Sequence, residues 1–237
     1  QPKKIVNRVT SPDLGMMFSM NPYQGCEHGC IYCYARNSHQ YWGFNSGLDF
    51  ETKIIVKKNA PQLLRQFLMN PRWECVPIGL SGNTDCYQPA EKKFGLTRAL
   101  LEVCNEFNQP VGLITKNAGM LRDKDILSEM GKKNLVSVLV SITSFNEDLR
   151  RVMEPRTTTG RQRLRLINEM LKQPRLSHVP VTDLRAVLRT MHIGREAEWL
   201  ATLIRWPVVL AILIAAALGG SFWNIVAVLT VAFTPGF

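Results

Sequence analysis

Short apolar runs alternate with amphipathic helical stretches over residues 16–172, and this alternation is the strongest constraint on the fold. The strand-like runs span residues 16–20, 76–80, 111–115 and 135–142, with a further run at 53–56. The helical stretches span residues 59–68, 91–107, 123–130 and 159–172. Short apolar runs bounded by turn residues suit buried parallel strands, and repeated strand–helix pairs form βαβ units. The sequence therefore predicts an α/β fold with about four βα units around a parallel sheet.

Polar clusters follow four of the predicted strands at the points where the strands end. They are Cys26–Cys33, Ser81–Asp85, Thr115–Asn117 and Ser141–Ser144. Ligand sites in parallel α/β folds lie at the carboxyl ends of the strands. We therefore expect these four segments, which are far apart in the sequence, to form one site at one rim of the sheet.

Three cysteines with the spacing Cys-x3-Cys-x2-Cys dominate the first of these clusters. Cys26, Cys30 and Cys33 lie in a loop that also contains Gly25 and Gly29. Cysteine thiolates hold iron–sulfur clusters, and three of them leave one iron of a cubane cluster without a protein ligand. Glycines let the backbone fold tightly around such a group. The loop therefore predicts a 4Fe–4S cluster with one iron open to a small chelating molecule.

A zinc site is the main alternative for the same loop. His28 or His39 would then supply the fourth ligand beside the three cysteines. Zinc sites usually pair two Cys-x2-Cys-like knuckles, and the sequence contains no second one. A zinc site therefore ranks below the iron–sulfur cluster in this interpretation.

The remaining cysteines show no ligand spacing. The first 20 residues contain no long apolar run typical of a secretory signal, so we expect a cytoplasmic protein with reduced thiols rather than a disulfide framework. Cys75 and Cys104 are predicted to be buried apolar side chains. Cys86 lies nearer the predicted rim, where a thiol could be reactive.

The cysteine loop resembles the signature of the radical S-adenosylmethionine (radical SAM) enzymes, in which an aromatic residue precedes the last cysteine, as Tyr32 does here. The run Gly82–Glu91 extends the resemblance to the subgroup related to the DNA-repair enzyme spore photoproduct lyase. The similarity covers Asn21–Arg156. It implies a partial (β/α) barrel and reductive cleavage of S-adenosylmethionine to a 5′-deoxyadenosyl radical, which abstracts hydrogen from a substrate.

The resemblance also implies roles for single residues. Cys26, Cys30 and Cys33 would ligate iron, and Tyr32 would lie near the adenine of the cofactor. A reductant such as flavodoxin or ferredoxin would deliver the electron. Glu154–Thr157 also matches the family, but we assign it no catalytic role.

Four further positions match residues that contact S-adenosylmethionine in the family. Thr84 and Asp85 correspond to the contact with the methionyl amino end. Lys116 corresponds to a lysine that pairs with the cofactor carboxylate, and Ser141 to a residue near the ribose. Each position also has an ordinary structural interpretation: Lys116 would be a solvated side chain, and Ser141 would simply end a strand.

The charge balance bears on the substrate. The formal net charge of +10 favours a polyanionic partner, which makes nucleic acid the leading substrate class. Phosphate binding requires basic side chains that converge on one surface, and a sequence by itself does not show which ones do.

The pattern changes after residue 172, and the sequence predicts three segments: a radical SAM partial barrel at 1–172, a polar helical linker at 173–198 and an apolar helical tail at 199–237. The tail contains one charged side chain, Arg205. Residues 207–233 could cross a bilayer once, giving a membrane association. A buried helix pair and a junction with an unrelated sequence after a truncated barrel are the alternatives, and we favour the junction or truncation.

The sequence therefore predicts a radical SAM enzyme domain with an incomplete barrel. The rival from another functional class is a non-catalytic iron–sulfur or zinc-binding module that the tail tethers to a membrane. The two differ in whether the protein binds S-adenosylmethionine once its cluster is formed.

Overall fold

The computed structural model describes residues 2–10 and 17–172, all of which belong to one compact unit, Gln1–Val179. The predicted linker at 173–198 and apolar tail at 199–237 lie outside the described residues. Among the helices in the described ranges, none has the length and apolar character needed to cross a membrane.

A five-stranded sheet with the order β1-β2-β5-β6-β7 forms the centre of the fold. Its strands are β1 (Val6–Arg8), β2 (Phe18–Met20), β5 (Ile78–Leu80), β6 (Val111–Thr115) and β7 (Val136–Val140). The last four run parallel, with Met20, Leu80 and Leu113 in register across neighbouring strands. The predicted α/β fold with a parallel sheet is confirmed.

Two strands depart from the prediction. The sequence interpretation predicted no strand in residues 1–10, but β1 pairs antiparallel with β2 and forms an edge of the sheet. The strand-like run at 53–56 belongs to a separate two-stranded sheet, in which β4 (Ile55–Val56) pairs with β3 (Tyr23–Gln24). β3 leads directly into the cysteine loop, so this small sheet positions the loop rather than extending the main sheet.

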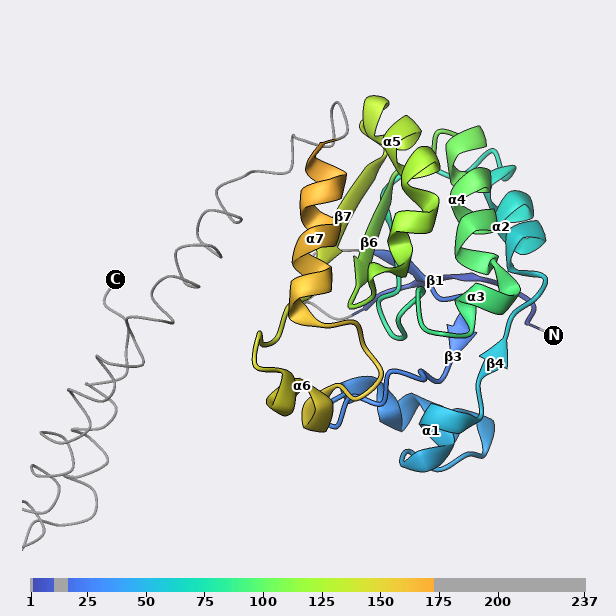
Figure 1. Cartoon of the computed structure of the whole chain (residues 1–237). Helices are drawn as coiled ribbons and strands as arrows, with labels where there is room; N and C mark the ends of the chain where they lie inside the picture. Colours follow the sequence, from blue (N-terminus) through green and yellow to red (C-terminus); the bar gives the residue numbers. More distant parts are fainter. Residues whose placement is uncertain (1, 11–16, 173–237) are drawn as a thin grey trace, which may run out of the picture. The chain divides into compact units, whose positions relative to one another are not determined.

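Helices follow the strands in chain order, and Figure 1 shows α2, α4, α5 and α7 arranged around the sheet. These helices are α2 (Ala60–Leu68), α3 (Glu91–Phe94), α4 (Leu96–Glu106), α5 (Lys124–Lys132) and α7 (Gly160–Leu171), with the 3₁₀ helix η2 (Ala118–Asp123) before α5. The helix predicted over 91–107 is interrupted at Gly95, whose φ of +63° ends α3. Thr159 and Gln162 form a capping box that begins α7.

Three further elements lie beyond one end of the strands (Figure 1). They are the 3₁₀ helix η1 (Tyr34–Trp42), α1 (Leu48–Thr52) and α6 (Glu147–Met153). The sequence interpretation did not predict α6, although Asn146 caps it by accepting hydrogen bonds from the backbone N–H groups of Asp148 and Leu149. These elements surround the cysteine loop.

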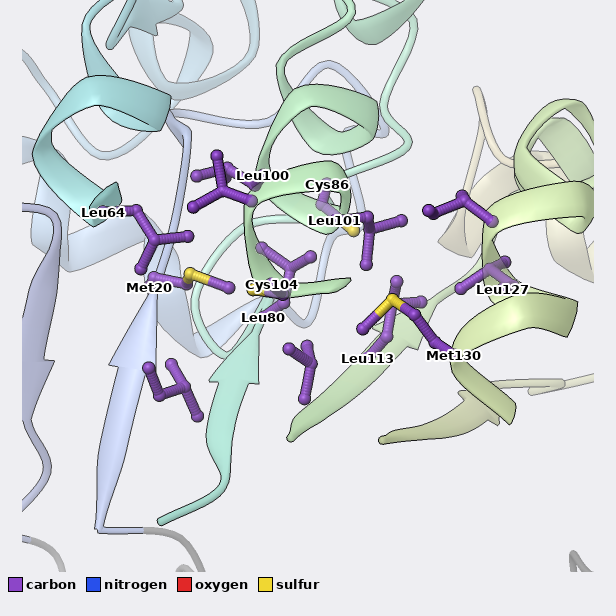
Figure 2. Packing of buried hydrophobic residues seen from close by; sticks show 14 of the residues in the cluster. Met20, Leu64, Leu80, Cys86, Leu100, Leu101, Cys104, Leu113, Leu127 and Met130 are labelled. Carbon is purple, nitrogen blue, oxygen red and sulfur yellow. The ribbon is translucent and has the colours of Figure 1, made fainter. Parts of the chain in front are cut away.

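The hydrophobic core lies between the sheet and the helices, and Figure 2 shows its strand and helix side chains in contact. Met20, Leu80 and Leu113 of the strands are fully buried. Their helical partners are Leu64, Leu100, Leu101, Cys104, Leu127 and Met130. Burial of each such side chain contributes roughly 1.5–3 kcal/mol, so this layer holds the strand ends in place.

The cysteines outside the loop are only partly as predicted. Cys104 is buried, as expected, but Cys75 is exposed, because it lies in an irregular segment before β5 with a φ of +55°. Cys86 is fully buried, and burial raises the pKa of its thiol well above the ordinary value. The expectation of a reactive thiol at Cys86 is therefore wrong, because a buried thiol with a raised pKa forms little thiolate.

Candidate cofactor site

The backbone of the cysteine loop is held by hydrogen bonds from other parts of the chain. The N–H of Cys26 donates to the carbonyl of Phe50 at 2.8 Å. The side chain of Gln88 binds the loop twice: its Oε1 accepts from the N–H of Glu27 at 3.0 Å, and its Nε2 donates to the carbonyl of Gly25 at 3.1 Å. The path of the loop is therefore fixed by specific partners.

Two arginines bind carbonyls of the same loop and share one carboxylate. Arg36 donates to the carbonyl of Cys30 at 3.1 and 3.0 Å, and Arg156 donates to the carbonyl of Glu27. Both guanidinium groups also pair with Glu51 of α1, one on each carboxylate oxygen. Burial by itself would raise the pKa of Glu51, but the two arginines lower it. This Arg36–Glu51–Arg156 bridge clamps the middle of the loop.

Both glycines of the loop occupy positions that other residues would fill poorly. Gly25 and Gly29 have φ values of +83° and +67°. A Cβ on Gly25 would lie 2.9 Å from the carbonyl oxygen of Phe50, and a Cβ on Gly29 would collide with the side chains of Arg156 and Glu51. The glycines are therefore required by both backbone conformation and space.

The three cysteines lie close together in this loop. Cys26 and Cys30 are buried and Cys33 is half-buried, and Cys26 and Cys33 pack around Ala35 and Phe50. Burial raises the pKa of Cys26 to about 12 and that of Cys30 to about 11, and nearby charges add to this. Across residues 2–10 and 17–172, no three His, Cys, Asp or Glu side chains are grouped to hold a single metal ion. The donor set of three thiols in a glycine-containing loop fits a cubane cluster, in which each cysteine binds a different iron.

Glu154 connects the cysteine loop to the ends of two strands. Its Oε1 accepts hydrogen bonds from the hydroxyls of Tyr32 and Thr143, the latter at 2.5 Å, and lies 3.1 Å from Nζ of Lys116. Burial by itself would raise the pKa of Glu154, but hydrogen bonds from Thr143, Tyr32 and Arg163 lower it to about 2. Glu154 is therefore an ionised carboxylate at the centre of the rim.

Arg163 of α7 binds the other oxygen of Glu154 and is itself only 1% exposed. It donates to Oε2 of Glu154 at 2.6 Å, to the hydroxyl of Thr157 at 2.6 Å and to the carbonyls of Thr158 and Ser141 at 2.8 and 2.7 Å. A buried arginine with this many partners fixes its neighbours in one arrangement. Arg163 thus ties α7 to the carboxyl end of β7.

Lys116 lies between the side chains predicted to contact the cofactor. Its ammonium group donates to Oγ of Ser141 at 2.8 Å and lies 5.5 Å from the ring centre of Tyr32. Burial by itself would lower the pKa of Lys116, but interactions with Tyr32 and Glu154 raise it. The structure thus brings together Tyr32, Lys116 and Ser141 from three separate elements.

Asp85 lies beneath this group and is saturated by hydrogen bonds. Its carboxylate accepts from the hydroxyl of Thr115 at 2.8 Å and from the N–H of Lys116 at 2.7 Å, and it lies 3.4 Å from Nδ1 of His28. Asp85 therefore fixes the backbone that carries Lys116. Burial lowers the pKa of His28, which favours its neutral form.

Thr84, the remaining predicted contact, uses its hydroxyl elsewhere. Its buried Oγ1 donates to the carbonyl of Tyr23 at 2.9 Å, and its N–H donates to Oδ1 of Asn21 at 3.3 Å. In this structure Thr84 shapes the turn after β5, and only its neighbour Asp85 contacts the Lys116 segment.

Two residues of the site, Arg163 and Arg36, were given no part in the site by the sequence interpretation, and Glu154 was noted only within a family match to which no role was assigned. Arg163 left a signal, because it lies on the same helix face as the buried Leu166 and Met170. A charged residue on an apolar face requires a buried partner. Arg36 left no comparable signal in the sequence, and the family match of Glu154–Thr157 did not show which partners Glu154 binds.

Comparison with known proteins gives a family. The model of the Radical SAM superfamily matches residues 20–190, which is more than half of the chain. An uncharacterized protein of Mycobacterium tuberculosis is 36% identical over 166 residues, and one of Methanocaldococcus jannaschii is 28% identical over 162 residues. An uncharacterized protein of Acidianus two-tailed virus is 24% identical over 170 residues.

The matched regions differ in how much of each protein they cover. The mycobacterial match covers 70% of this chain and 49% of the relative, the archaeal match 68% and 57%, and the viral match 70% and 55%. The chain therefore spans about half the length of the curated relatives that it matches. No solved structure matches the chain.

Proposed function

The chain belongs to the radical SAM superfamily, and from this premise we propose that it is an enzyme that reductively cleaves S-adenosylmethionine to start a radical reaction. When bound, the 4Fe–4S cluster supplies the electron for this cleavage, which yields a 5′-deoxyadenosyl radical that abstracts hydrogen from the substrate. Cys26, Cys30 and Cys33 would hold the cluster. A flavodoxin or ferredoxin would be the reductant.

One observation carries this proposal: Tyr32, Lys116 and Ser141 converge beside the cysteine loop, although they come from separate elements. The Lys116 ammonium would bind the cofactor carboxylate, because a raised pKa keeps it charged. Ser141 would bind a ribose hydroxyl, and the ring of Tyr32, which is 44% exposed, would lie against the adenine.

Asp85 and Thr84 have a different part in the proposed site. Asp85 would be a positioning residue on the methionyl amino side, because its bonds to Thr115 and to the N–H of Lys116 hold that segment in place. Thr84 would act through the turn that it shapes. Glu154 would keep Lys116 and Tyr32 in position before the cofactor binds.

We also propose a partial (β/α) barrel of the spore photoproduct lyase-like type acting on nucleic acid. The support is a basic segment at the rim: residues 150–165 contain six arginines, and their one acidic residue, Glu154, is buried. Arg151, Arg161 and Arg165 of this segment are exposed, whereas Arg156 is engaged in the clamp on the cysteine loop. Exposed arginines beside a cofactor site suit a phosphate backbone.

The test is anaerobic reconstitution with iron and sulfide, followed by electron paramagnetic resonance (EPR) of the reduced protein with and without S-adenosylmethionine. We expect a 4Fe–4S signal that changes when the cofactor is added. Cys30→Ala should abolish the cluster, and Cys75→Ala, which removes an exposed cysteine outside the loop, should retain it. A cluster that does not respond to the cofactor, or zinc bound in its place, would instead support the non-catalytic binding module.

A further inference from the structure

His39 is a fully buried histidine whose two ring nitrogens both lack a hydrogen-bond partner among the described residues. Burial of a polar group without a partner costs free energy, so such a group requires an explanation, for example a bound ligand, ion or water molecule. The cofactor contacts described above do not involve this side chain.

The ring of His39 lies against the cysteine loop. η1 begins directly after Cys33, and its two buried residues are Ala35 and His39. Ala35 packs with Cys26 and Phe50, so the buried side of η1 faces the cysteines. The segment is anchored there, because Gln24 donates a hydrogen bond at 2.7 Å to Ser38, the residue before His39.

The contacts of the ring place one of its edges beside Gly25, the residue before Cys26. The ring centre of His39 lies 5.1 Å from that of Phe44 and 5.5 Å from that of Phe50. A Cβ on Gly25 would come within 3.0 Å of Cε1, the ring carbon between the two nitrogens. The edge of the ring that carries both nitrogens therefore faces Gly25, and without a cluster neither nitrogen has a hydrogen-bond partner there among the described residues.

We propose that His39 donates a hydrogen bond to the sulfur atoms of the cysteine-bound cluster on the Cys26 side, and thereby raises its reduction potential. This inference rests on the proposed function, because it requires the cluster. Reduction adds negative charge to a cluster, and N–H donors to its sulfurs stabilise the reduced form. Residues around a metal site tune it in this way without ligating it.

Two other partners are possible for the ring nitrogens of His39, and each predicts a different outcome of the experiment below. The ring could turn toward the carboxylate of Asp49, which already accepts from the N–H of Asn45 at 3.1 Å and pairs with Lys53 at 3.1 Å. It could also bind a metal directly, as in the zinc interpretation.

The experiment compares three substitutions in the reconstituted full chain. His39→Phe keeps an aromatic ring between Phe44 and Phe50 but removes both nitrogens. His39→Asn and His39→Gln restore an N–H donor near the position of Nδ1 and of Nε2, respectively. Tyr41→Phe is the matched control, because Tyr41 lies on the same helix and is 92% exposed.

The measurement is the cluster midpoint potential from an EPR-monitored redox titration. We expect a more negative midpoint for His39→Phe, so that less than half of its cluster is reduced at the wild-type midpoint. One of the two amide variants should recover the wild-type value, and Tyr41→Phe should not differ from it. An unchanged potential in His39→Phe would overturn the proposal.

Pulsed EPR adds a readout for direct ligation. A hydrogen-bonded His39 should give a weak nitrogen coupling that disappears in His39→Phe, and a strong coupling of a directly bound nitrogen would overturn the proposal. The response of the wild-type cluster to S-adenosylmethionine is measured separately. The proposed function can therefore stand when the role of His39 fails.

Discussion

The cysteine loop adjoins the Glu154 rim, which is the group of side chains bound to Glu154 (Tyr32, Lys116 and Arg163). Different kinds of interaction keep the two regions in place. In the loop, partners bind backbone groups: the Cys26 N–H and the carbonyls of Glu27 and Cys30. In the rim, side chains bind one another around a single carboxylate, Glu154. The loop should therefore respond mainly to changes in backbone shape, and the rim mainly to changes in charge.

The largest effect is expected when the rim loses its central charge. Glu154→Gln leaves the buried Arg163 without a carboxylate, at a cost on the order of 3 kcal/mol in the free energy of unfolding. Chemical denaturation of the cluster-free protein at pH 7 measures it. Glu169→Gln, which alters an exposed ion pair on the same helix, should change nothing measurable. Equal stabilities for both variants would contradict the comparison.

The same variant has a pH signature. The pKa of Glu154 in the folded protein is about 2, below its ordinary value of 4.5. Its stabilisation is therefore complete at neutral pH and is lost as the pH falls from about 5 toward 2. The stability difference between the wild type and Glu154→Gln should shrink over that range, and a constant difference would mean that the charge is not the cause.

A change of backbone shape should affect the loop next most strongly. Gly29→Ala should cost about 2 kcal/mol, because a positive φ and a collision with Arg156 act together. Gly43→Ala is the matched control: its φ is +76°, but its Cβ would meet nothing within 4 Å, so about 1 kcal/mol is expected. Urea denaturation and the iron content per chain measure both, and equal losses would remove the evidence for a spatially restricted loop.

Removal of the positive charge of Lys116 should weaken the binding of S-adenosylmethionine and leave cluster assembly in the cysteine loop unchanged. Lys116→Gln is expected to weaken S-adenosylmethionine binding about tenfold, equivalent to about 1.4 kcal/mol, because the carboxylate loses its cation. The iron content should stay at the wild-type level. Titration of the reduced cluster with cofactor measures the affinity, with Lys133→Gln as a surface control. Loss of the cluster in Lys116→Gln would show that the two regions are not separate.

The smallest effect is expected at Ser141. Ser141→Ala removes one neutral hydroxyl, so cofactor affinity should fall about two- to fivefold, or by less than about 1 kcal/mol. Ser141→Thr keeps the hydroxyl and should bind as the wild type does. Identical affinity in the alanine variant would mean that Ser141 simply ends β7.

The sequence predicted the parts of the fold that depend on local pattern. Apolar runs and helical periodicity predicted the parallel strands and their helices, because both signals lie within short windows. β1 was missed, because a strand of only three residues, two of them polar, forms only through pairing with β2. α6 was missed as well, since it is only seven residues long and has no buried residue.

The candidate site likewise contains residues that could be predicted from the sequence and residues that could not. The cysteine spacing lies within eight residues and was readable directly, and Tyr32, Lys116 and Ser141 were located by resemblance. Glu154 was missed as the centre of the rim, because its partner Tyr32 is 122 residues away in the sequence. Contacts of this range are fixed by the fold, and the sequence shows them only where a residue conflicts with its local pattern, as Arg163 does.

The bridge through Glu51 also sets an order of events during synthesis. Arg156 binds the carbonyl of Glu27 from 129 residues further along the chain. The ribosome must therefore make, and the chain must fold, four βα units before the cysteine loop takes its final form. Iron and sulfide offered to a growing chain would meet three unorganised thiols, so cluster insertion should follow the folding of this unit rather than start it.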